Sequence, residues 1–282
     1  MSGFRPRLIP VLLLHNGGLV KTRKFAQPTY IGDPINAVRI FNDLQADELT
    51  FLDISASQKG CLPSLDFVRD VAAEAHMPFA VGGGIRSLSQ IQQLLQSGAE
   101  KVVLGGIAVE RPEFVGQAAR EFGRSTIAVC MDIKKTFWKP PTVWHLNASR
   151  NSGQSPLEFA RRMQDLGAGE LIVQSVERDG SMRGYDLGLL RQIADALSIP
   201  IVALGGAASL EDLRRGHVEG GAQGLAAGSL FVFHGSMRGV LLNYPTRPQI
   251  QRLFSRRIQS KSASTASPST SLRCRATSAP TW

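Results

Sequence analysis

Two glycine-rich runs in this chain combine the residue types that hold a phosphate group. They are Phe79–Ser87 (FAVGGGIRS) and Pro200–Ser209 (PIVALGGAAS), and each begins with apolar residues that predict a buried β-strand. Glycine lets the backbone turn tightly and approach a ligand, and the serine predicts the start of a helix, whose N-terminus favours an anion. We therefore expect two phosphate sites. Their expected lining residues are Gly83, Gly84, Gly105 and Gly106 in the first, and Gly205, Gly206, Gly228 and Ser229 in the second.

The two runs belong to a longer internal repeat. Pro78–Ser87 aligns with Pro200–Ser209 at a shift of 122 residues, and Asp47–Leu49 aligns with Gly169–Leu171 at the same shift. A register held over such a distance indicates two fused halves, each with its own glycine module.

Four further polar side chains follow predicted strands and are candidates for chemistry: Asp53, Asp132, Asp179 and Lys21. Asp53, taken alone, fits a structural cap or an ion pair with an arginine. Asp132 is the stronger candidate, because it ends an otherwise apolar strand that leads toward the phosphate sites. The histidines show no metal-ligand spacing, so we expect neither a metal site nor a cofactor.

These residues need a scaffold that brings the ends of several strands together. Short apolar runs alternate with helix-periodic segments, and continuous apolar runs are typical of a parallel sheet. Counting gives eight strands, so we predict an α/β fold, a (β/α)8 TIM barrel built from two repeated halves. In such barrels the chemistry lies at the carboxyl ends of the strands. We predict loops at Lys21–Lys24 and over residues 133–155.

The net charge of the 282-residue chain is +9, but the positive charge is concentrated near its end. Seven Lys/Arg residues and no acid occur from Arg247 onward, so residues 1–246 carry only +2. This distribution does not indicate a nucleic-acid partner. We expect residues 1–246 to form the barrel and residues 247–282 to form a basic, Ser/Thr-rich tail that is disordered from Ser260 onward.

Three widely spaced cysteines, Cys61, Cys130 and Cys274, indicate a reducing compartment rather than a disulfide framework. The first residues show no signal-peptide pattern, and no apolar run approaches the length of a membrane span. We therefore expect a cytoplasmic protein without a membrane partner.

Several short motifs occur in the order found in one enzyme family. They are Ile9–Pro10, Asn16–Gly17, Leu19–Lys21, Gly32–Pro34, Asp47–Leu49, Phe51–Ile54, Val81–Ile85, Asp179–Gly180 and Gly184–Asp186. Over about residues 5 to 240 the chain resembles the cyclase subunit of imidazole glycerol phosphate synthase. The resemblance implies a barrel that binds a substrate with a phosphate at each end, with Asp179 and Gly180 among the phosphate-site residues. It also implies a glutamine amidotransferase partner that feeds ammonia through the barrel.

In that family two aspartates, at the ends of strands one and five, act as a general acid–base pair. The resemblance places Asp132 at the strand-five position and Leu13 at the strand-one position, and a leucine cannot move a proton. Lys21 and Asp53 are retained and are carried over as catalytic residues beside Asp132. Leu104–Ile107 lacks the Asn-Thr/Ser pair that the family usually has there.

The resemblance also covers the opposite end of the barrel. Arg7, Glu48, Lys101 and Glu170 stand at the starts of predicted strands and match the family's four-residue charged gate at the ammonia entrance. Glu100 occupies a position where the family has an acid at the partner interface.

A retained entrance and a missing aspartate lead to the first hypothesis. The chain resembles a divergent branch linked to surface-polysaccharide amidation, in which the barrel and its glutaminase supply ammonia to a separate ATP-dependent amidating enzyme. The second hypothesis is a working histidine-pathway cyclase that makes imidazole glycerol phosphate and the aminoimidazole carboxamide ribotide by-product, with proton transfer shared by Asp132 and Asp53. A phosphosugar isomerase, which needs no ammonia entrance, and a non-catalytic scaffold remain as alternatives.

Overall fold

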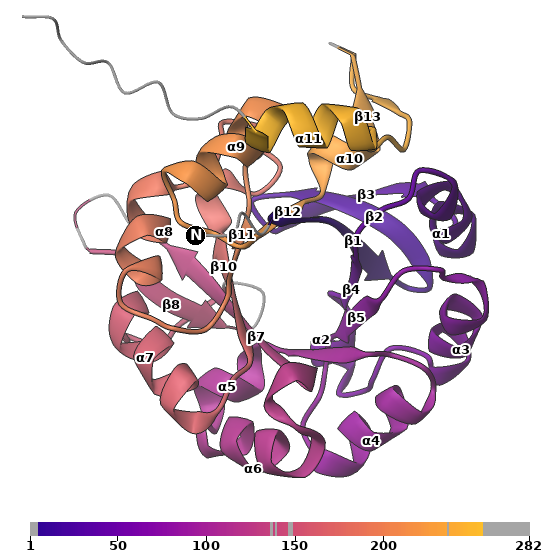
Figure 1. Cartoon of the computed structure of the whole chain (residues 1–282). Helices are drawn as coiled ribbons and strands as arrows, with labels where there is room; N and C mark the ends of the chain where they lie inside the picture. Colours follow the sequence, from indigo (N-terminus) through magenta and orange to yellow (C-terminus); the bar gives the residue numbers. More distant parts are fainter. Residues whose placement is uncertain (1–4, 136–137, 139, 146–148, 236, 256–282) are drawn as a thin grey trace, which may run out of the picture.

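The structure is a computed structural model that describes residues 5–135, 138, 140–145, 149–235 and 237–255. In these residues eight parallel strands close into a barrel, which confirms the predicted (β/α)8 fold (Figure 1). The last barrel strand pairs with the first, and the ladder between β7 and β10 completes the ring. The barrel strands, in order around the ring, are β1 (Arg7–His15), β4 (Leu49–Asp53), β5 (Phe79–Gly82), β6 (Lys101–Leu104), β7 (Ile127–Lys134), β10 (Glu170–Ser175), β11 (Ile201–Leu204) and β12 (Gly224–Ala227).

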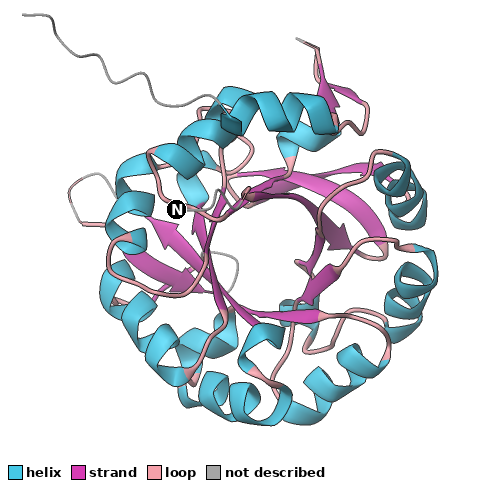
Figure 2. Cartoon of the chain, viewed as in Figure 1, coloured by secondary structure: helices cyan, strands magenta, loops and turns pink. Residues whose placement is uncertain are grey.

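Helices form an outer ring around these strands (Figure 2). The first begins as predicted, because Asp33 accepts a hydrogen bond from the backbone N–H of Asn36 at 2.8 Å and Pro34 takes the first helical position. The helices are α1 (Pro34–Asp43), α2 (Ala56–Lys59), α3 (Leu65–Glu74), α4 (Leu88–Gln96), α5 (Gly106–Glu110), α6 (Glu113–Phe122), α7 (Pro156–Leu166), α8 (Leu187–Ala194), α9 (Leu210–Val218), α10 (Ser229–Val232) and α11 (Arg247–Ser255), with short 3-10 turns η1 (Arg124–Thr126) and η2 (Val176–Arg178).

The repeat seen in the sequence is also a repeat of backbone geometry. Gly83 and Gly205 both have positive φ angles, of 127° and 97°. A Cβ on Gly83 would lie 2.5 Å from the carbonyl oxygen of Asp53, and a Cβ on Gly205 would lie 2.7 Å from that of Ser175. Each module therefore needs glycine for the same reason, a tight turn against the end of the neighbouring strand.

Two segments that we predicted as loops form strands instead. β2 (Gly18–Arg23) and β3 (Ala26–Gly32) make a hairpin that pairs with β1, so most of the Lys21–Lys24 cluster lies in a strand. In the 133–155 segment, β7 continues to Lys134, and β8 (Thr142–His145) and β9 (Arg150–Asn151) extend the sheet. The reason is that β1 and β7 run past the ends of their neighbours and leave backbone groups that these segments pair.

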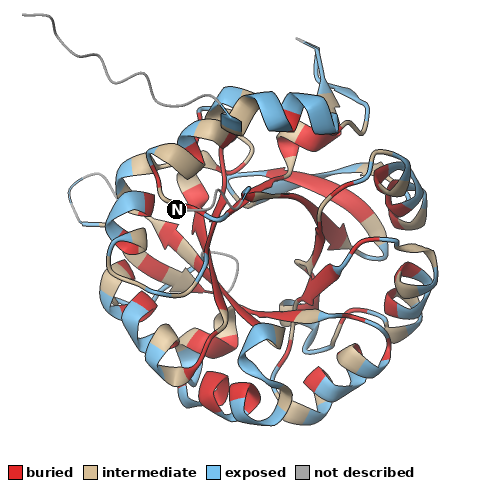
Figure 3. Cartoon of the chain, viewed as in Figure 1, coloured by how far each residue is buried: buried red, intermediate tan, exposed pale blue. Residues whose placement is uncertain are grey.

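Two apolar layers stabilise the barrel, and Figure 3 shows the buried positions concentrated on the strands. The larger layer lies between strands and helices and contains large side chains such as Phe51 and Phe159. The smaller layer lies inside the barrel and contains Ile9, Val11 and Ile172. Because side chains alternate along a strand, every second residue of each barrel strand points inward.

The chain beyond the last barrel strand wraps the outside of the barrel. After α10 it forms a small hairpin of β13 (Phe233–His234) and β14 (Gly239–Val240), and then α11. α11 packs against α9, where the rings of Phe254 and His217 lie 5.7 Å apart. The first residues of the expected tail are thus helical, whereas Ser260–Trp282 and Cys274 lie outside the described residues. None of the helices in the described ranges has the length and apolar content needed to cross a membrane.

Candidate active site

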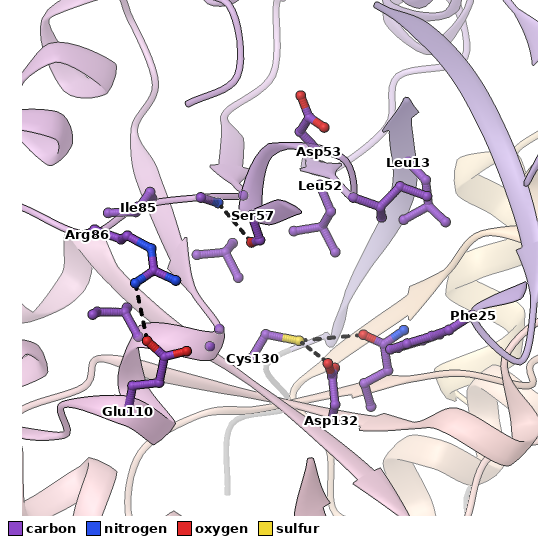
Figure 4. A pocket seen from close by; sticks show the side chains of 18 of the residues that line it. Leu13, Phe25, Leu52, Asp53, Ser57, Ile85, Arg86, Glu110, Cys130 and Asp132 are labelled. Carbon is purple, nitrogen blue, oxygen red and sulfur yellow. Dashed lines mark hydrogen bonds and ion pairs between the residues drawn. The ribbon is translucent and has the colours of Figure 1, made fainter. Parts of the chain in front are cut away.

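The carboxyl ends of the barrel strands surround a cavity of about 150 Å³ (Figure 4). Gly83, Gly84, Gly105 and Gly106, the glycines of the first predicted site, line it together with Asp132. A Cβ on Gly105 or Gly106 would meet no protein atom within 4 Å, so this stretch of backbone faces open space. The sequence prediction that brought these residues together is consistent with this geometry.

The helix starts near the two sites differ in whether their N–H groups are available. At α4 the backbone N–H of Ser87 donates to Gln90 Oε1 at 3.2 Å, and an equivalent capping box closes the start of α9. The N–H groups of Ser87 and Ser209 are therefore already bonded to side chains of their own helices. By contrast, α5 and α10 begin at Gly106 and Ser229 without a side-chain cap, and the first N–H groups of a helix have no intrahelical acceptor. The backbone N–H groups at these two helix starts are therefore free of side-chain acceptors.

A second, smaller cavity contains the glycines of the second site. Gly205, Gly206, Gly228 and Ser229 line it, and so does Lys21 from β2. Lys21 is only 6 % exposed, and its Nζ lies so close to Gly228 that a Cβ there would be 2.0 Å away. A buried cation beside a glycine backbone and an uncapped helix start suits an anionic ligand.

Asp179 lies beside Lys21 and affects both its charge and its position. Burial lowers the pKa of the Lys21 ammonium, and the nearby Asp179 carboxylate opposes that effect. Asp179 Oδ2 accepts hydrogen bonds from Thr22 Oγ1 at 2.9 Å and from the backbone N–H of Phe25 at 3.3 Å. A Cβ on Gly180 would lie 2.4 Å from the carbonyl oxygen of Thr22. Because a carboxylate repels phosphate, these contacts suit an anchor for the β2–β3 hairpin better than a direct phosphate contact.

Asp132 stands in the wall of the first cavity at the end of β7. Burial raises the pKa of its carboxyl from 3.8 to about 7, although the hydrogen bond from the Cys130 thiol opposes the shift. Cys130 Sγ lies 3.8 Å from Asp132 Oδ1 (Figure 4) and 3.5 Å from Gln174 Oε1. A carboxyl that titrates near neutral pH can both give and take a proton, so Asp132 is suited to acid–base chemistry.

Leu13 occupies on β1 the position that Asp132 occupies on β7. In the strand register Leu13 pairs with Leu52, and Asp132 pairs with Gln174. Leu52 and Gln174 are 122 residues apart, which is the period of the internal repeat. The carboxyl ends of the barrel strands form the mouth of the barrel. One half of this mouth therefore presents two apolar side chains, Leu13 and Leu52, where the other half presents the carboxyl of Asp132 and the amide of Gln174.

Asp53 also lines the first cavity, but its contacts are local. Its Oδ1 accepts hydrogen bonds from the backbone N–H and hydroxyl of Ser55, at 2.8 and 2.7 Å, and from the backbone N–H of Ala56 at 3.0 Å. These bonds shape the turn before α2.

The strand starts carry a closed ring of charges at the opposite end of the barrel. Arg7 donates to both Glu48 and Glu170, and Lys101 Nζ lies 3.0 Å from Glu48 Oε1 and 3.3 Å from Glu170 Oε2. We call these four residues the charged ring. Burial disfavours the Arg7 charge, but the two carboxylates outweigh it and raise the pKa of the guanidinium. The structure thus brings together all four residues that the sequence suggested.

A small cavity, lined mostly by apolar side chains, lies directly inside the charged ring. Ile9, Val11, Ala80, Ala128 and Ala226 line a narrow cavity that also touches ring residues. Exposed Glu100 lies outside the ring, next to Lys101 in the chain, and its Oε2 accepts a hydrogen bond from the backbone N–H of Phe79 at 2.9 Å.

Sequence reasoning missed several residues of the mouth. Cys130 and Gln174 were not predicted, although each lies on the inward-facing alternation of a predicted strand, which was a usable signal. Arg86 and Glu110 form an ion pair of 3.3 Å at the first cavity (Figure 4), and no sequence pattern pairs them. Within the described residues, no three His, Cys, Asp or Glu side chains are arranged to hold a metal ion.

Fold and site together define a TIM barrel with two glycine-lined cavities at one end and a charged ring at the other. The family model described as "Histidine biosynthesis protein" matches residues 7–238, and the chain belongs to this family. It is similar to proteins with the provisional name imidazole glycerol phosphate synthase subunit HisF. The one from Leptospira interrogans is 43 % identical over 251 residues, covering 89 % of this chain and 99 % of the relative.

Two further relatives carry numbered forms of the same provisional name. Subunit hisF3 of Vibrio vulnificus is 41 % identical over 243 residues, which cover 86 % of this chain and 94 % of that protein. Subunit hisF2 of Pseudomonas aeruginosa is 42 % identical over 241 residues, which cover 86 % of this chain and 96 % of that protein. The chain is therefore HisF-like over the whole barrel.

Proposed function

We propose that this chain is a divergent HisF-type subunit that receives ammonia from a glutamine amidotransferase and delivers it to the phosphate-lined mouth, with cyclisation weak or lost. The observation that carries the proposal is the contrast between the two ends of one barrel. The charged ring is complete and closed, whereas the proton-transfer pair is reduced to Asp132 by Leu13.

Ammonia delivery is supported by the layering inside the barrel. Two cations and two carboxylates in the charged ring neutralise one another, so a small neutral molecule meets no net charge there. Behind the ring, side chains such as Ala80, Ala128 and Ala226 leave a narrow apolar space. Ammonia is small and uncharged, whereas hydrated ions would lose their water in this space.

The substrate class follows from the two anion sites. Lys21 with Gly228 and Ser229 binds one phosphate, and Gly105 with Gly106 binds the other. A ligand that spans both sites passes over Leu13, which lines both cavities, and comes within reach of Asp132. We therefore propose a bis-phosphate or phosphosugar-type ligand, and we assign no cofactor.

The partners and location are part of the same proposal. The glutaminase docks at the strand-start end through Glu100, and a separate ATP-dependent amidating enzyme uses the ammonia on a surface-polysaccharide sugar. The complex works in the cytoplasm, without nucleic acid or membrane.

The competing function is a histidine-pathway cyclase, and the provisional names of the relatives favour it. It would require Asp53 to replace the strand-one aspartate, but Asp53 Oδ1 already accepts three hydrogen bonds from its own turn. A phosphosugar isomerase or a scaffold needs no ammonia entrance, so neither function explains the charged ring.

Conversion of the histidine-pathway nucleotide intermediate, with ammonium salts and no glutaminase, tests the proposal. Loss of one positioned acid or base typically slows a reaction by about 10²–10⁴-fold, so we expect turnover below that of a two-aspartate cyclase by this factor. Glutaminase activity of the partner should rise when this chain is added. Full turnover with ammonium salts would contradict the proposal.

A further inference from the structure

Two members of the charged ring, Arg7 and Glu48, lie on neighbouring strand starts that are not paired with each other by backbone hydrogen bonds. Arg7 lies at the start of β1, and Glu48 lies directly before β4. β1 and β4 are neighbours, but their register begins only at Val11 and Thr50. Arg7 and Glu48 therefore project from strand starts that backbone hydrogen bonds between the two strands do not hold together.

A buried tyrosine from the segment between β14 and α11 bridges these two starts. The Tyr244 hydroxyl donates to the carbonyl oxygen of Leu8 at 3.0 Å and accepts from the backbone N–H of Asp47 at 3.1 Å. Leu8 directly follows Arg7, and Asp47 directly precedes Glu48. One phenolic oxygen thus connects the backbone next to Arg7 with the backbone next to Glu48.

The Asp47 carboxylate reinforces the bridge. Its Oδ2 accepts the backbone N–H of Leu8 at 2.9 Å, so Asp47 and Tyr244 occupy both polar groups of that residue. Arg5 binds the same carboxylate through two hydrogen bonds of 2.9 and 2.6 Å, which fixes its orientation.

Tyr244 is itself held firmly. It is 8 % exposed, and its ring lies 5.4 Å from that of Phe231 in α10. The backbone N–H of Asn243 donates to the carbonyl oxygen of Phe231 at 2.9 Å. The hydroxyl is therefore presented to Leu8 and Asp47 from a fixed support.

We propose that Tyr244 is a positioning residue for the charged ring, and that it keeps Arg7 and Glu48 in register so that the ring stays closed over the narrow cavity behind it. The part of this inference that concerns ammonia rests on the proposed function, because it takes the ring as the ammonia entrance. Without the hydroxyl, the starts of β1 and β4 separate, the ring pairs lengthen, and ammonia from the glutaminase escapes to solvent.

Tyr244→Phe tests the inference, and Tyr185→Phe is the matched control. Tyr185 is also buried, and its hydroxyl also donates to a strand carbonyl, that of Ala226 at 2.9 Å. Each variant thus loses one buried phenolic hydroxyl. Tyr244 bonds the residues next to Arg7 and Glu48, whereas Tyr185 bonds Ala226, which lines the cavity behind the ring.

The first readout needs no activity. In NMR spectra of the isolated chain, we expect the side-chain resonances of Arg7 and Lys101 to shift in Tyr244→Phe and to stay in place in Tyr185→Phe. If Tyr244→Phe does not fold, Asp47→Asn, which removes the charged partner of Arg5 from the same bridge, should shift the same resonances. Unchanged resonances, or equal shifts in the control, would overturn the inference.

The second readout uses the complex with the glutaminase. We expect the share of glutamine-derived ammonia that is incorporated into product to fall about two- to tenfold in Tyr244→Phe, which is the factor equivalent to one buried hydrogen bond. The rate of product formation with ammonium salts should be unchanged. An equal fall in both rates would contradict the positioning role. If no glutaminase binds, the proposed function fails, and the NMR result alone decides the role of Tyr244.

Discussion

Leu13 on β1 lies across the barrel from Asp132 on β7, four strands away in either direction around the ring. The internal repeat makes these positions equivalent, so a symmetric pair of proton-transfer groups would be expected here. Instead, one wall of the mouth is a carboxyl with a pKa of about 7 and the other is an isobutyl group. At these two equivalent positions, a ligand between them can exchange a proton with Asp132 but not with Leu13.

The raised pKa of Asp132 makes a prediction about stability. Between its ordinary pKa of 3.8 and its folded-state pKa of about 7, the native state binds a proton that the unfolded state has released. The stability of the wild-type protein therefore decreases with rising pH over this range and stays lower above it. Asp132→Asn lacks this titration, so the variant should gain stability relative to wild type between pH 5 and pH 8. Thermal unfolding at several pH values measures the difference.

Asp165→Asn is the control for that series, because Asp165 is exposed on α7. Its difference from wild type should vary little with pH. A constant difference for Asp132→Asn would mean that the carboxyl is ionised throughout and that burial does not hold its proton.

Lys21 provides the second prediction, which concerns phosphate binding. Lys21→Met keeps an unbranched side chain, one atom shorter, and removes the buried charge beside Gly228. A hydrogen bond to a charged group contributes about 1.5–3 kcal/mol, so phosphate should bind the second site about 10- to 100-fold more weakly. Calorimetry with inorganic phosphate measures this. Lys59→Met, which removes an exposed lysine bonded to Asn16, should leave the affinity unchanged, and equal loss in both variants would contradict the assignment.

The third prediction separates the charged ring from ordinary surface ion pairs. Glu48→Gln removes a buried carboxylate that contacts both Arg7 and Lys101, and we expect it to lower the free energy of unfolding by about 2 kcal/mol. Asp66→Asn removes an exposed partner of Arg69, and its effect should stay below about 1 kcal/mol. Denaturant unfolding compares the two. Equal effects would show that the ring behaves as solvated surface charge.

The fourth prediction concerns docking of the glutaminase. Glu100→Lys reverses an exposed charge beside the ring, and we expect the complex with a glutaminase subunit to be lost in size-exclusion chromatography. Glu113→Lys reverses a charge at the start of α6, near the opposite end of the barrel, and should leave the complex intact. Circular dichroism confirms that both variants are folded. If Glu100→Lys still formed the complex, the assignment of the docking surface to the region around Glu100 would be wrong.

Much of this fold could be predicted because local and global signals agree. The glycine modules, the Asp33 cap and the alternating apolar strands each impose a local geometry that the barrel also needs. The charged ring could be predicted from a resemblance alone, since its members are far apart in sequence and meet only when the barrel closes.

Most of the missed features arise from long-range effects. Lys21 and Thr22 are buried because the β2–β3 hairpin folds back beside β1, and a charged run in isolation gives no sign of that. The closed start of α4 was predictable, because Ser87 and Gln90 have the spacing of a capping box. The bridge from Tyr244 was not, because it joins residues that are 236 positions apart in the sequence.

The most direct test of the central claim is the ammonium-dependent cyclisation rate of Leu13→Asp compared with wild type. The account predicts that the restored carboxylate raises the rate by up to about 10²–10⁴-fold, provided that inward-facing apolar neighbours such as Leu52 do not force it to stay protonated, and that Asp132→Asn removes the gain. A wild-type chain that already turns over fully, and is unaffected by Leu13→Asp, would contradict the account.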